Sequence, residues 1–415
     1  MNNKKVLYLI IAVLFILVAV LSIMLVLPEN EENSKAESDI SQTFDISEIS
    51  REISESSSEE ISESVSAEIS EEESILPDIS FVPAVSDEVS EPADTPSLPP
   101  EEETSTPDEV SEEPQVLITV PQITVPQVTG SAWDGSVSSG FEKGSGTQND
   151  PYVISTPAQL AFFRDSVNSG NDYDGKFIML SQSIKICEFD VEDPDENTVL
   201  WVGIGTDANP FRGTFNGNGN AVCGLYGDGL FGVISGNIQN VIIANSYVTS
   251  GGAVVGSAVK NYDLAEHYPF IYGCCVTDST VNGIGGVIGY AGGYKVENCI
   301  NSATVKGNSE WVGGVVGEFA LGTMTNCFNL GIVSADTVCG GIVGNAFNSS
   351  FSQCYNVGVV NGSEFGGGFA AVDYTSTYKN CGYSDTSAEY ALKTIDGAFV
   401  TETNGISVLN SDQIG

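Results

Sequence analysis

GGVIGYAGGYKVENCIN, residues 285–301, is the first of four related phrases in this sequence of 415 residues. The phrase returns as GGVVG…TNCFN at 313–329, as GGIVG…SQCYN at 340–356 and, with its final glycine lost, as GGFAA…KNCGY at 367–383. The starts are 28, 27 and 27 residues apart, and a cysteine follows each glycine phrase at the same offset, at Cys299, Cys327, Cys354 and Cys381. A fixed period of this length is typical of solenoids, whose units bury their apolar faces by stacking on one another.

Within each period, short runs of β-branched and aromatic residues alternate with Gly, Asn, Ser and Asp. A helical repeat would need apolar residues at helical spacing over ten or more positions, and each glycine of the pair would cost it about 1 kcal/mol. One period fits a coil of short strands, with equivalent strands about 4.8 Å apart in successive coils. The sequence therefore predicts an all-β fold, a parallel β-helix.

Two further phrases, DGLFG at 228 and GAVVG at 252, extend the register backwards and predict six coils over residues 228–383. The longer spacing after the second phrase indicates an insertion at 260–270, which should form a surface loop. It contains His267, the only histidine.

The combination GG-[IV]-[IV]-G followed by N-C-x-N resembles the GLUG-motif family of bacterial surface proteins, which includes regions of immunoglobulin A1 proteases. WVGIGTDANPFRGTFNGNGNAVCGL, residues 201–225, is similar to the opening module that often precedes such repeats. The similarity covers about residues 144–383, and residues 384–415 match nothing in it, so we assign them to a C-terminal cap or tail. The resemblance implies a β-helix displayed at a cell surface.

The N-terminal part predicts a tether. Residues 1–5 include two lysines and are expected in the cytoplasm, and the apolar run at 6–27 is long enough, at about 33 Å as a helix, to cross a bilayer. A cleaved secretory signal is the alternative. Residues 29–129 hold 28 acidic against two basic residues and many serines and prolines, which predicts a disordered stalk.

Residues 130–227 are predicted to cap the solenoid before its repeats begin. Thr156, Pro157 and Gln159 form a helix N-terminal signal, Gly170 ends the helix, and a strand is expected at 176–186. The acidic segment at 188–197 is expected to be a solvent-exposed loop, with calcium binding as the alternative.

Charge and cysteine usage limit the partners. The net charge of −42 excludes nucleic acid, because phosphate backbones require a basic face. The four register cysteines are expected to form a ladder of buried thiols, since equivalent Cβ atoms about 4.8 Å apart are too distant for a relaxed disulfide. Adjacent Cys274 and Cys275 are the better candidates for a bond. The other cysteines are Cys187, Cys223 and Cys339.

No catalytic, cofactor-binding or metal-binding residue can be assigned, and no cofactor is expected. A single histidine allows no HExxH zinc motif, and Arg164 and Arg212, the arginines of the folded part, lie outside the six predicted coils. Scattered carboxylates leave glycoside cleavage open. Aromatic side chains that could project toward a ligand are Tyr290, Tyr294, Trp311, Phe319 and Tyr355, although aromatics in solenoids mostly pack inside.

These observations lead to two functional hypotheses. The first is a single-pass, membrane-anchored bacterial surface protein whose extracellular, non-catalytic β-helix serves adhesion or binding to a cell envelope or host surface, with a glycan or protein as the ligand. The second is a glycan-active β-helix enzyme, a polysaccharide hydrolase or lyase. The sequence gives no oligomeric state.

Overall fold

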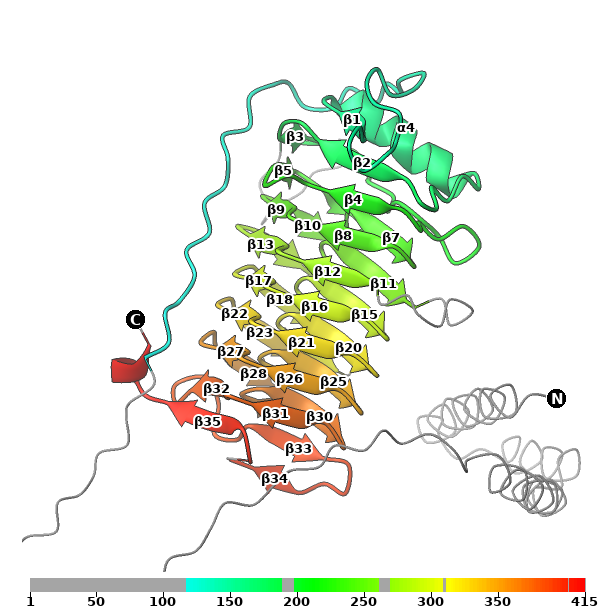
Figure 1. Ribbon diagram of the computed structural model, residues 1–415. Helices are drawn as coiled ribbons and strands as arrows, with labels where there is room; N and C mark the ends of the chain where they lie inside the picture. Colours follow the sequence, from blue (N-terminus) through cyan, green and yellow to red (C-terminus); the bar gives the residue numbers. More distant parts are fainter. Residues whose placement is uncertain (1–116, 189–197, 261–268, 309–310, 402, 415) are drawn as a thin grey trace, which may run out of the picture. The chain divides into compact units, whose positions relative to one another are not determined.

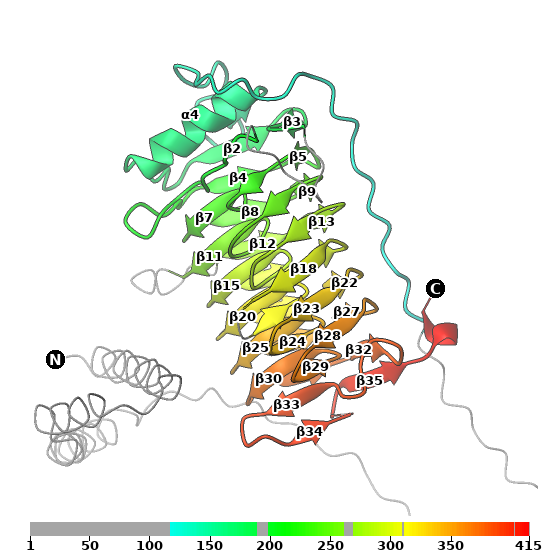
Figure 2. The ribbon, with the colours of Figure 1, turned by 180° about the vertical axis from the view of Figure 1, so that it is seen from behind.

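Successive turns of the chain stack their strands into five sheets of a parallel solenoid; three sheets of eight or nine strands run along most of it, and the other two contain six and three strands (Figure 1 and Figure 2). This computed structural model describes residues 117–188, 198–260, 269–308, 311–401 and 403–414. The predicted membrane segment at 6–27, His267 and nearly all of the acidic loop at 188–197 lie outside these ranges. Among the described residues, no helix combines the length and apolarity needed to span a bilayer.

We name the sheets S1 to S5 in the order in which one coil visits them. S1 contains β7 (Phe231–Ile234), β11 (Val255–Val259), β15 (Ile288–Gly292), β20 (Val316–Ala320), β25 (Val343–Phe347), β30 (Ala370–Tyr374), β33 (Leu392–Thr394) and β34 (Phe399–Val400). S2 contains β1 (Tyr152–Ile154), β2 (Phe177–Leu180), β4 (Thr214–Asn216), β8 (Asn237–Gln239), β12 (Phe270–Tyr272), β16 (Lys295–Glu297), β21 (Thr323–Thr325), β26 (Ser350–Ser352) and β31 (Thr377–Lys379).

The remaining sheets complete each coil. S3 contains β3 (Ile184–Lys185), β5 (Ala221–Cys223), β9 (Ile242–Ala244), β13 (Cys275–Thr277), β17 (Ile300–Asn301), β22 (Phe328–Asn329), β27 (Tyr355–Asn356), β32 (Cys381–Ser384) and β35 (Ile406–Leu409). S4 contains β6 (Tyr226–Gly227), β10 (Tyr247–Val248), β14 (Thr280–Val281), β18 (Thr304–Gly307), β23 (Val333–Ala335) and β28 (Val360–Gly362). S5 contains β19 (Val312–Gly313), β24 (Val338–Gly340) and β29 (Phe365–Gly367).

The predicted all-β parallel solenoid is confirmed, but the expected number of coils was too small. S2 and S3 each contain nine strands, so the solenoid has about nine turns rather than six. The difference arises at both ends. Strands of residues 152–227, predicted only as a cap, pair in register with the repeats, as when β2 pairs β4 and β4 pairs β8. Beyond the last repeat, β35 adds a further strand to S3.

The N-terminal cap is built around the helix α4 (Pro157–Asn168). Its start follows the predicted signal, because the Thr156 hydroxyl accepts a hydrogen bond from the Gln159 amide and Pro157 occupies the first turn. The Gln159 side-chain oxygen in turn accepts from the Ser155 amide at 2.8 Å. The strand expected at 176–186 is present as two pieces, β2 and β3, separated by a turn. At the other end, the short 3-10 helix η1 (Ser411–Gln413) follows β35.

A cysteine ladder runs through the core beside S3. Cys299, Cys327, Cys354 and Cys381 lie at equivalent positions and are at most 3% exposed, as predicted. Cys274 is a fifth member, which the sequence reasoning had set aside as a disulfide candidate. It is buried because β13 pairs Cys275 with Ile300 and so aligns Cys274 with Cys299. None of the nine cysteines forms a disulfide.

An asparagine ladder two residues further on explains the rest of the N-C-x-N motif. Asn301, Asn329 and Asn356 are completely buried. The Asn301 side-chain amide donates to the Asn329 amide oxygen, and that of Asn329 donates to the Asn356 amide oxygen, both at 2.8 Å. Each also bridges the backbone two residues on, as where Asn329 accepts from the Gly331 amide and donates to its carbonyl. The ladder therefore satisfies its own polar atoms inside the core.

The paired glycines of each phrase make room for this ladder. A Cβ atom on Gly341 would lie 2.2 Å from the side-chain nitrogen of Asn356, and one on Gly314 would lie 2.5 Å from Cγ of Asn329. The residue before each register cysteine turns the corner with positive φ, for example 53° at Asn326, which asparagine tolerates better than most residues. Glycine pair, corner asparagine, cysteine and buried asparagine thus form one structural unit.

Candidate functional site

The aromatic residues singled out in the sequence are mostly structural. Tyr294 and Phe319 are 1% exposed and Tyr355 is 8% exposed, so little of these three side chains is accessible to a ligand. The Tyr294 hydroxyl donates to the Gly236 carbonyl at 3.0 Å. Tyr290 and Trp311 are half-buried. The five residues are not brought together on one exposed face.

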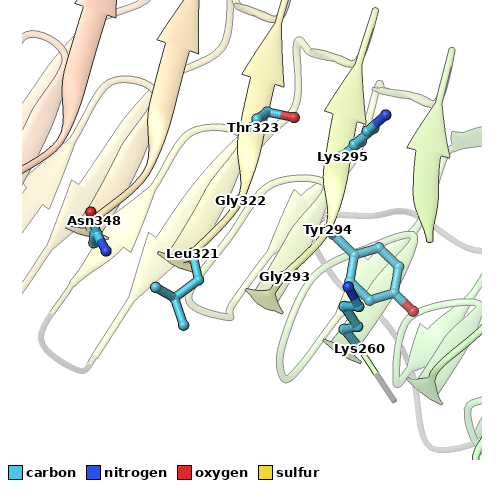
Figure 3. A pocket seen from close by; sticks show the side chains of 8 residues that line it. All are labelled: Lys260, Gly293, Tyr294, Lys295, Leu321, Gly322, Thr323 and Asn348. Carbon is cyan, nitrogen blue, oxygen red and sulfur yellow. The ribbon is translucent and has the colours of Figure 1, made fainter. Parts of the chain in front are cut away.

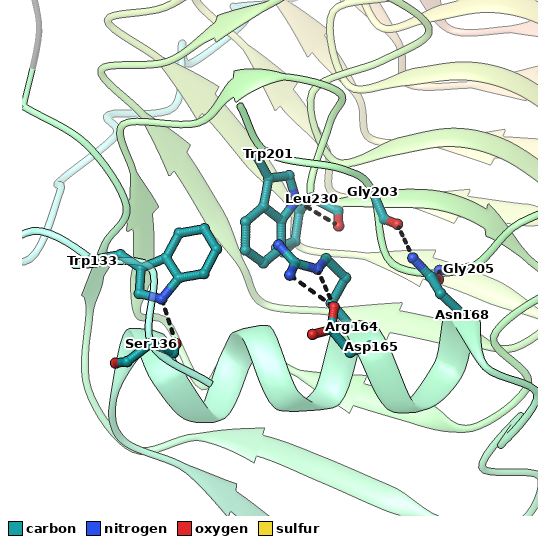
Figure 4. A network of polar contacts seen from close by, with 9 residues as sticks. All are labelled: Trp133, Ser136, Arg164, Asp165, Asn168, Trp201, Gly203, Gly205 and Leu230. Carbon is teal, nitrogen blue, oxygen red and sulfur yellow. Dashed lines mark hydrogen bonds and ion pairs between the residues drawn. The ribbon is translucent and has the colours of Figure 1, made fainter. Parts of the chain in front are cut away.

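The two arginines of the folded part also have structural roles. The Arg164 guanidinium lies between the indoles of Trp133 and Trp201, 5.2 and 4.9 Å from the ring centroids, and it pairs with Asp165 at 2.8 Å (Figure 4). Arg212 pairs with Asp172 at 3.7 Å. Both arginines therefore form ion pairs within the capped end of the solenoid.

A flat hydroxyl face lies on the outside of S2, and we define it by Thr323, Thr325, Ser350, Ser352 and Thr377. These residues alternate along their strands with core residues such as Met324 and Phe351. Strand register places Thr323, Ser350 and Thr377 in one row, and Thr325 and Ser352 in a second row. The spacing between neighbours in a row is that of the coils, about 4.8 Å.

The hydroxyl face is ordered by its own hydrogen bonds. Thr325 and Ser352 hydroxyls lie 3.0 Å apart, and the Thr377 hydroxyl donates to that of Ser350 at 3.0 Å. The corner residue Asn326 donates from its side chain to the Asn298 amide oxygen. None of the five defining residues is charged, whereas the chain carries a net charge of −42.

A groove adjoins this face at the turns that connect S1 to S2. Its volume is about 270 Å³, and it is lined by Lys260, Gly293, Tyr294, Lys295, Leu321, Gly322, Thr323 and Asn348. Figure 3 shows Lys295 and Thr323 on neighbouring strands, while Leu321 and Asn348 occupy the turns that precede β21 and β26. Thr323 therefore belongs to both the groove and the hydroxyl face.

The groove combines the groups that recognise sugars. Leu321 is 50% exposed and offers an apolar surface, Thr323 and Asn348 offer a hydroxyl and an amide, and Lys260 and Lys295 offer ammonium groups. Among the described residues that line it, none carries a carboxylate. Small-molecule sites typically present such an apolar wall with a few polar groups. Along S2, the exposed ring of Tyr272 aligns with Glu297 and Thr325, which adds an aromatic to the same face.

Glu318, on the outer side of S1, has a carboxyl group with a raised pKa. Burial raises the pKa of Glu318 above its ordinary value of 4.5. Its register neighbours in adjacent coils are Tyr290 and Asn345, so no second carboxylate occupies the equivalent position on either side. The side-chain oxygen of Asn345 is buried and has no hydrogen-bond partner among the described residues.

The cysteines do not form a metal site. Within the described ranges, no group of three or more His, Cys, Asp or Glu residues is arranged to hold a metal ion. Burial raises the pKa of the Cys274 and Cys327 thiols well above the usual range, and raises that of Cys275 to about 12. Thiolates, the form that binds metals and attacks electrophiles, are therefore disfavoured at these three positions.

Sequence reasoning missed the hydroxyl face, although its signal is visible. TMT, SFS and TYK stand directly before the corner residue in three successive repeats, and alternation places the outer two residues of each triplet on the same side. The groove could not be found this way, because it joins residues of four successive coils.

Comparison with known proteins supports a coarse assignment. No protein-family model matches the chain. It is 32% identical over 142 residues to a provisionally named Gly-rich membrane protein of Evansella cellulosilytica, and 27% identical over 202 residues to halomucin of Haloquadratum walsbyi. These alignments cover 31% and 45% of the chain, but only 15% and 2% of the two relatives.

A crystal structure from Bacteroides ovatus, provisionally named an immunoglobulin A1 protease, aligns with a TM-score of 0.44 at 22% identity. The alignment covers 66% of this chain and 88% of that one. The similarity to a membrane protein and the β-solenoid fold fit a surface β-helix protein. They do not assign an activity.

Proposed function

We propose that this chain is a membrane-anchored surface protein of the GLUG-repeat type, and that its solenoid is a non-catalytic module that binds glycan on the hydroxyl face and in the adjoining groove. In this proposal residues 6–27 anchor the chain with the N-terminus in the cytoplasm and the solenoid outside. The acidic stalk holds the solenoid away from the membrane. Adhesion to a cell envelope or host surface is the expected role.

The observation that carries the proposal is the continuity of the hydroxyl face with the groove through Thr323. Sugar rings present hydroxyl groups that both donate and accept hydrogen bonds, as do serine and threonine. A planar array of hydroxyls on a rigid sheet is therefore complementary to an extended glycan. The array costs little entropy on binding because its rotamers are already held by mutual hydrogen bonds.

Glycan cleavage is the second candidate, and Glu318 is the observation that favours it. A carboxyl group with a raised pKa is the usual general acid of a glycosidase. Most such enzymes also need a second carboxylate about 5–10 Å away. Because the register neighbours of Glu318 are Tyr290 and Asn345, the described strands do not supply that partner beside it. Binding without cleavage is therefore favoured.

The test uses the full chain in nanodiscs on arrays of neutral and acidic glycans and matrix proteins, with product assays on the same polysaccharides. We expect saturable glycan binding without product, unchanged by Glu318→Gln. Turnover that Glu318→Gln abolishes would replace the proposal with the enzymatic alternative. Binding to proteins alone would also contradict glycan recognition.

Anchoring needs a separate check. We expect the full chain to stay with membranes through high-salt washing, because an apolar helix of this length does not depend on ionic contacts. Mature protein that begins after residue 28 would show that the segment is a cleaved signal.

A further inference from the structure

Residues 117–129, the last part of the predicted stalk, lie along the outside of the solenoid. Figure 1 and Figure 2 both show this segment, in cyan, running beside the coils from the C-terminal end to the capped end. Composition placed the boundary of the folded part after residue 129, whereas the structure has contacts from Ile118 onwards. We call residues 117–129 the strap.

Contacts fix both ends of the strap. At the C-terminal end, Ile118 pairs with Ile414, and its amide donates to the Gln413 carbonyl at 2.7 Å. Ile118 is 5% exposed and belongs to an apolar cluster with Phe328, Tyr355 and Leu409. At the capped end, side chains of Val125 and Val128 pack on a second cluster, formed by Ala221, Cys223 and Ala244.

The strap sequence suits this position. Its motif ITVPQ occurs twice, from Ile118 and from Ile123, and is followed by Val128. Ile118, Val120, Ile123, Val125 and Val128 are buried or half-buried, whereas Thr119, Gln122, Thr124 and Gln127 are exposed. The prolines lack an amide hydrogen, so the strap cannot become a strand of a sheet and instead crosses the strands as an extended chain.

The length of the strap matches the stack that it covers. The ten residue steps from Ile118 to Val128 span about 33 Å when extended. Seven strand steps of S3 separate β5 from β35, which amounts to about 34 Å. The strap therefore reaches from the last strand of S3 to its second strand without slack.

We propose that the strap is the point at which the tether pulls on the solenoid. This attachment turns the solenoid so that its C-terminal coils face the membrane and α4 is outermost. The chain arriving from the stalk meets the solenoid at Ile118, beside the C-terminus, and not at the cap. A pull toward the membrane then acts along the strap and loads its contacts in shear, which presses the coils together. The orientation relative to the membrane rests on the anchor of the proposed function, whereas the docking of the strap does not.

Docking is tested in the full chain by energy transfer from a fluorescent amino acid at position 117. Acceptors are placed at Ser411, near the end of the chain, or at Asp174, in the cap. We expect strong transfer to position 411 and weak transfer to position 174. Equal transfer to both, or stronger transfer to position 174, would overturn the proposal.

Two paired substitutions separate docking from added charge. Ile118→Asp with Val125→Asp places carboxylates in the two apolar clusters, and Thr119→Asp with Gln127→Asp adds the same charge on the exposed side. We expect the first pair to lower transfer to position 411 several-fold and to make the strap sensitive to protease, while the second pair changes neither. No difference between the pairs would contradict docking, and transfer that depends on protein concentration would mean that straps exchange between two copies.

Orientation is tested with the same labels in vesicles that carry acceptor lipids, in chains that lack residues 29–106, because the complete stalk would hold both labels beyond the range of energy transfer. We expect a donor at position 411 to be quenched more than a donor at position 174, and the Ile118→Asp, Val125→Asp pair to reduce that difference. Stronger quenching at position 174 in the unsubstituted chain would overturn the orientation. If the chain does not float with the vesicles, the anchor of the proposed function fails, while the transfer between positions 117 and 411 still reports on the strap.

Discussion

The capped end and the repeating coils bury their cores in different ways. In the cap, large rings from separate elements pack together. The ring centroid of Phe163 in α4 lies 5.4 Å from that of Phe211 and 5.2 Å from that of Tyr173. The centroids of Phe215 and Phe231 are 5.1 Å apart. The coils also bury rings, such as Phe351 and Phe369 with centroids 5.4 Å apart, but they add side chains that contact copies of themselves, as in the cysteine and asparagine ladders.

This difference teaches where stability is concentrated. Each ring of the cap packs against several different partners, so no equivalent contact elsewhere compensates for its removal. A ladder side chain of the coils contributes less by itself, and its loss affects the coils directly above and below. The cap should therefore depend on its aromatic residues, whereas the coils should depend both on their buried rings and on the hydrogen-bonded register of the asparagine ladder.

The largest effect is expected from Phe163→Ala. This completely buried ring packs among five other aromatic rings, and its removal should cost about 3–5 kcal/mol. Urea unfolding followed by the fluorescence of the cap tryptophans measures the loss. The matched control is Phe162→Ala, a half-buried neighbour on the same helix. Equal losses of unfolding free energy at the two positions would contradict the idea that the cap depends on this buried ring.

The next largest effect is expected from Asn329→Leu, at the centre of the asparagine ladder. It leaves the Asn301 amide and the Asn356 amide oxygen without a ladder partner, at about 1–3 kcal/mol for each group. Hydrogen exchange should show the loosening mainly in the coils of 301–356. The control, Asn361→Leu, is exposed on β28. Loosening that reaches α4 would mean that cap and coils are not distinct.

A smaller effect is expected at the cysteine ladder. Cys327→Ser introduces a more polar group into a completely buried position and should cost about 1–3 kcal/mol, whereas Cys327→Ala should cost less. Thermal unfolding of the two variants gives the order. Because burial raises its thiol pKa, Cys327 should also react slowly with thiol reagents in the native state. Fast labelling there would contradict a packed ladder.

The smallest effect is expected from the pH dependence of Glu318. Its pKa is raised in the folded state above the ordinary 4.5, so the folded protein holds this proton more tightly than the unfolded chain. Stability due to this group is present below pH 4.5 and is lost as the pH rises through the raised value. Glu318→Gln should therefore raise the melting temperature at pH 7 and leave it nearly unchanged at pH 3.5. An unchanged value at pH 7 would show that Glu318 is well solvated.

The sequence predicted what the repeats determine and missed what depends on single contacts. The period, the buried cysteines and the helix start at Thr156 are local patterns with one physical solution each. The nine turns were underestimated because the opening module shares the strand pairing of the repeats without sharing their glycine phrase. The strap was assigned to the stalk because proline and acid dominate the composition upstream, whereas its docking depends on the apolar side chains of Ile118, Val125 and Val128, which pack on residues of S3.

The candidate site was less predictable for a related reason. Aromatic residues were chosen by type, but whether a ring projects depends on alternation within each short strand, which buries Tyr294 and Phe319 and leaves Tyr272 exposed. The hydroxyl face follows from the same alternation. The groove requires the turns of neighbouring coils to be placed beside one another, which no local pattern specifies.

Glycan binding by full chains with altered outer faces tests most directly whether the hydroxyl face is the binding surface. Thr325→Arg with Ser352→Arg places two long charged side chains on this face, and Thr304→Arg with Asn361→Arg places the same charges on the outside of S4. We predict that the first pair lowers glycan affinity at least about tenfold, a loss of about 1.4 kcal/mol, while the second pair binds like the unsubstituted chain. Full binding by the first pair, with loss in the second, would contradict the assignment.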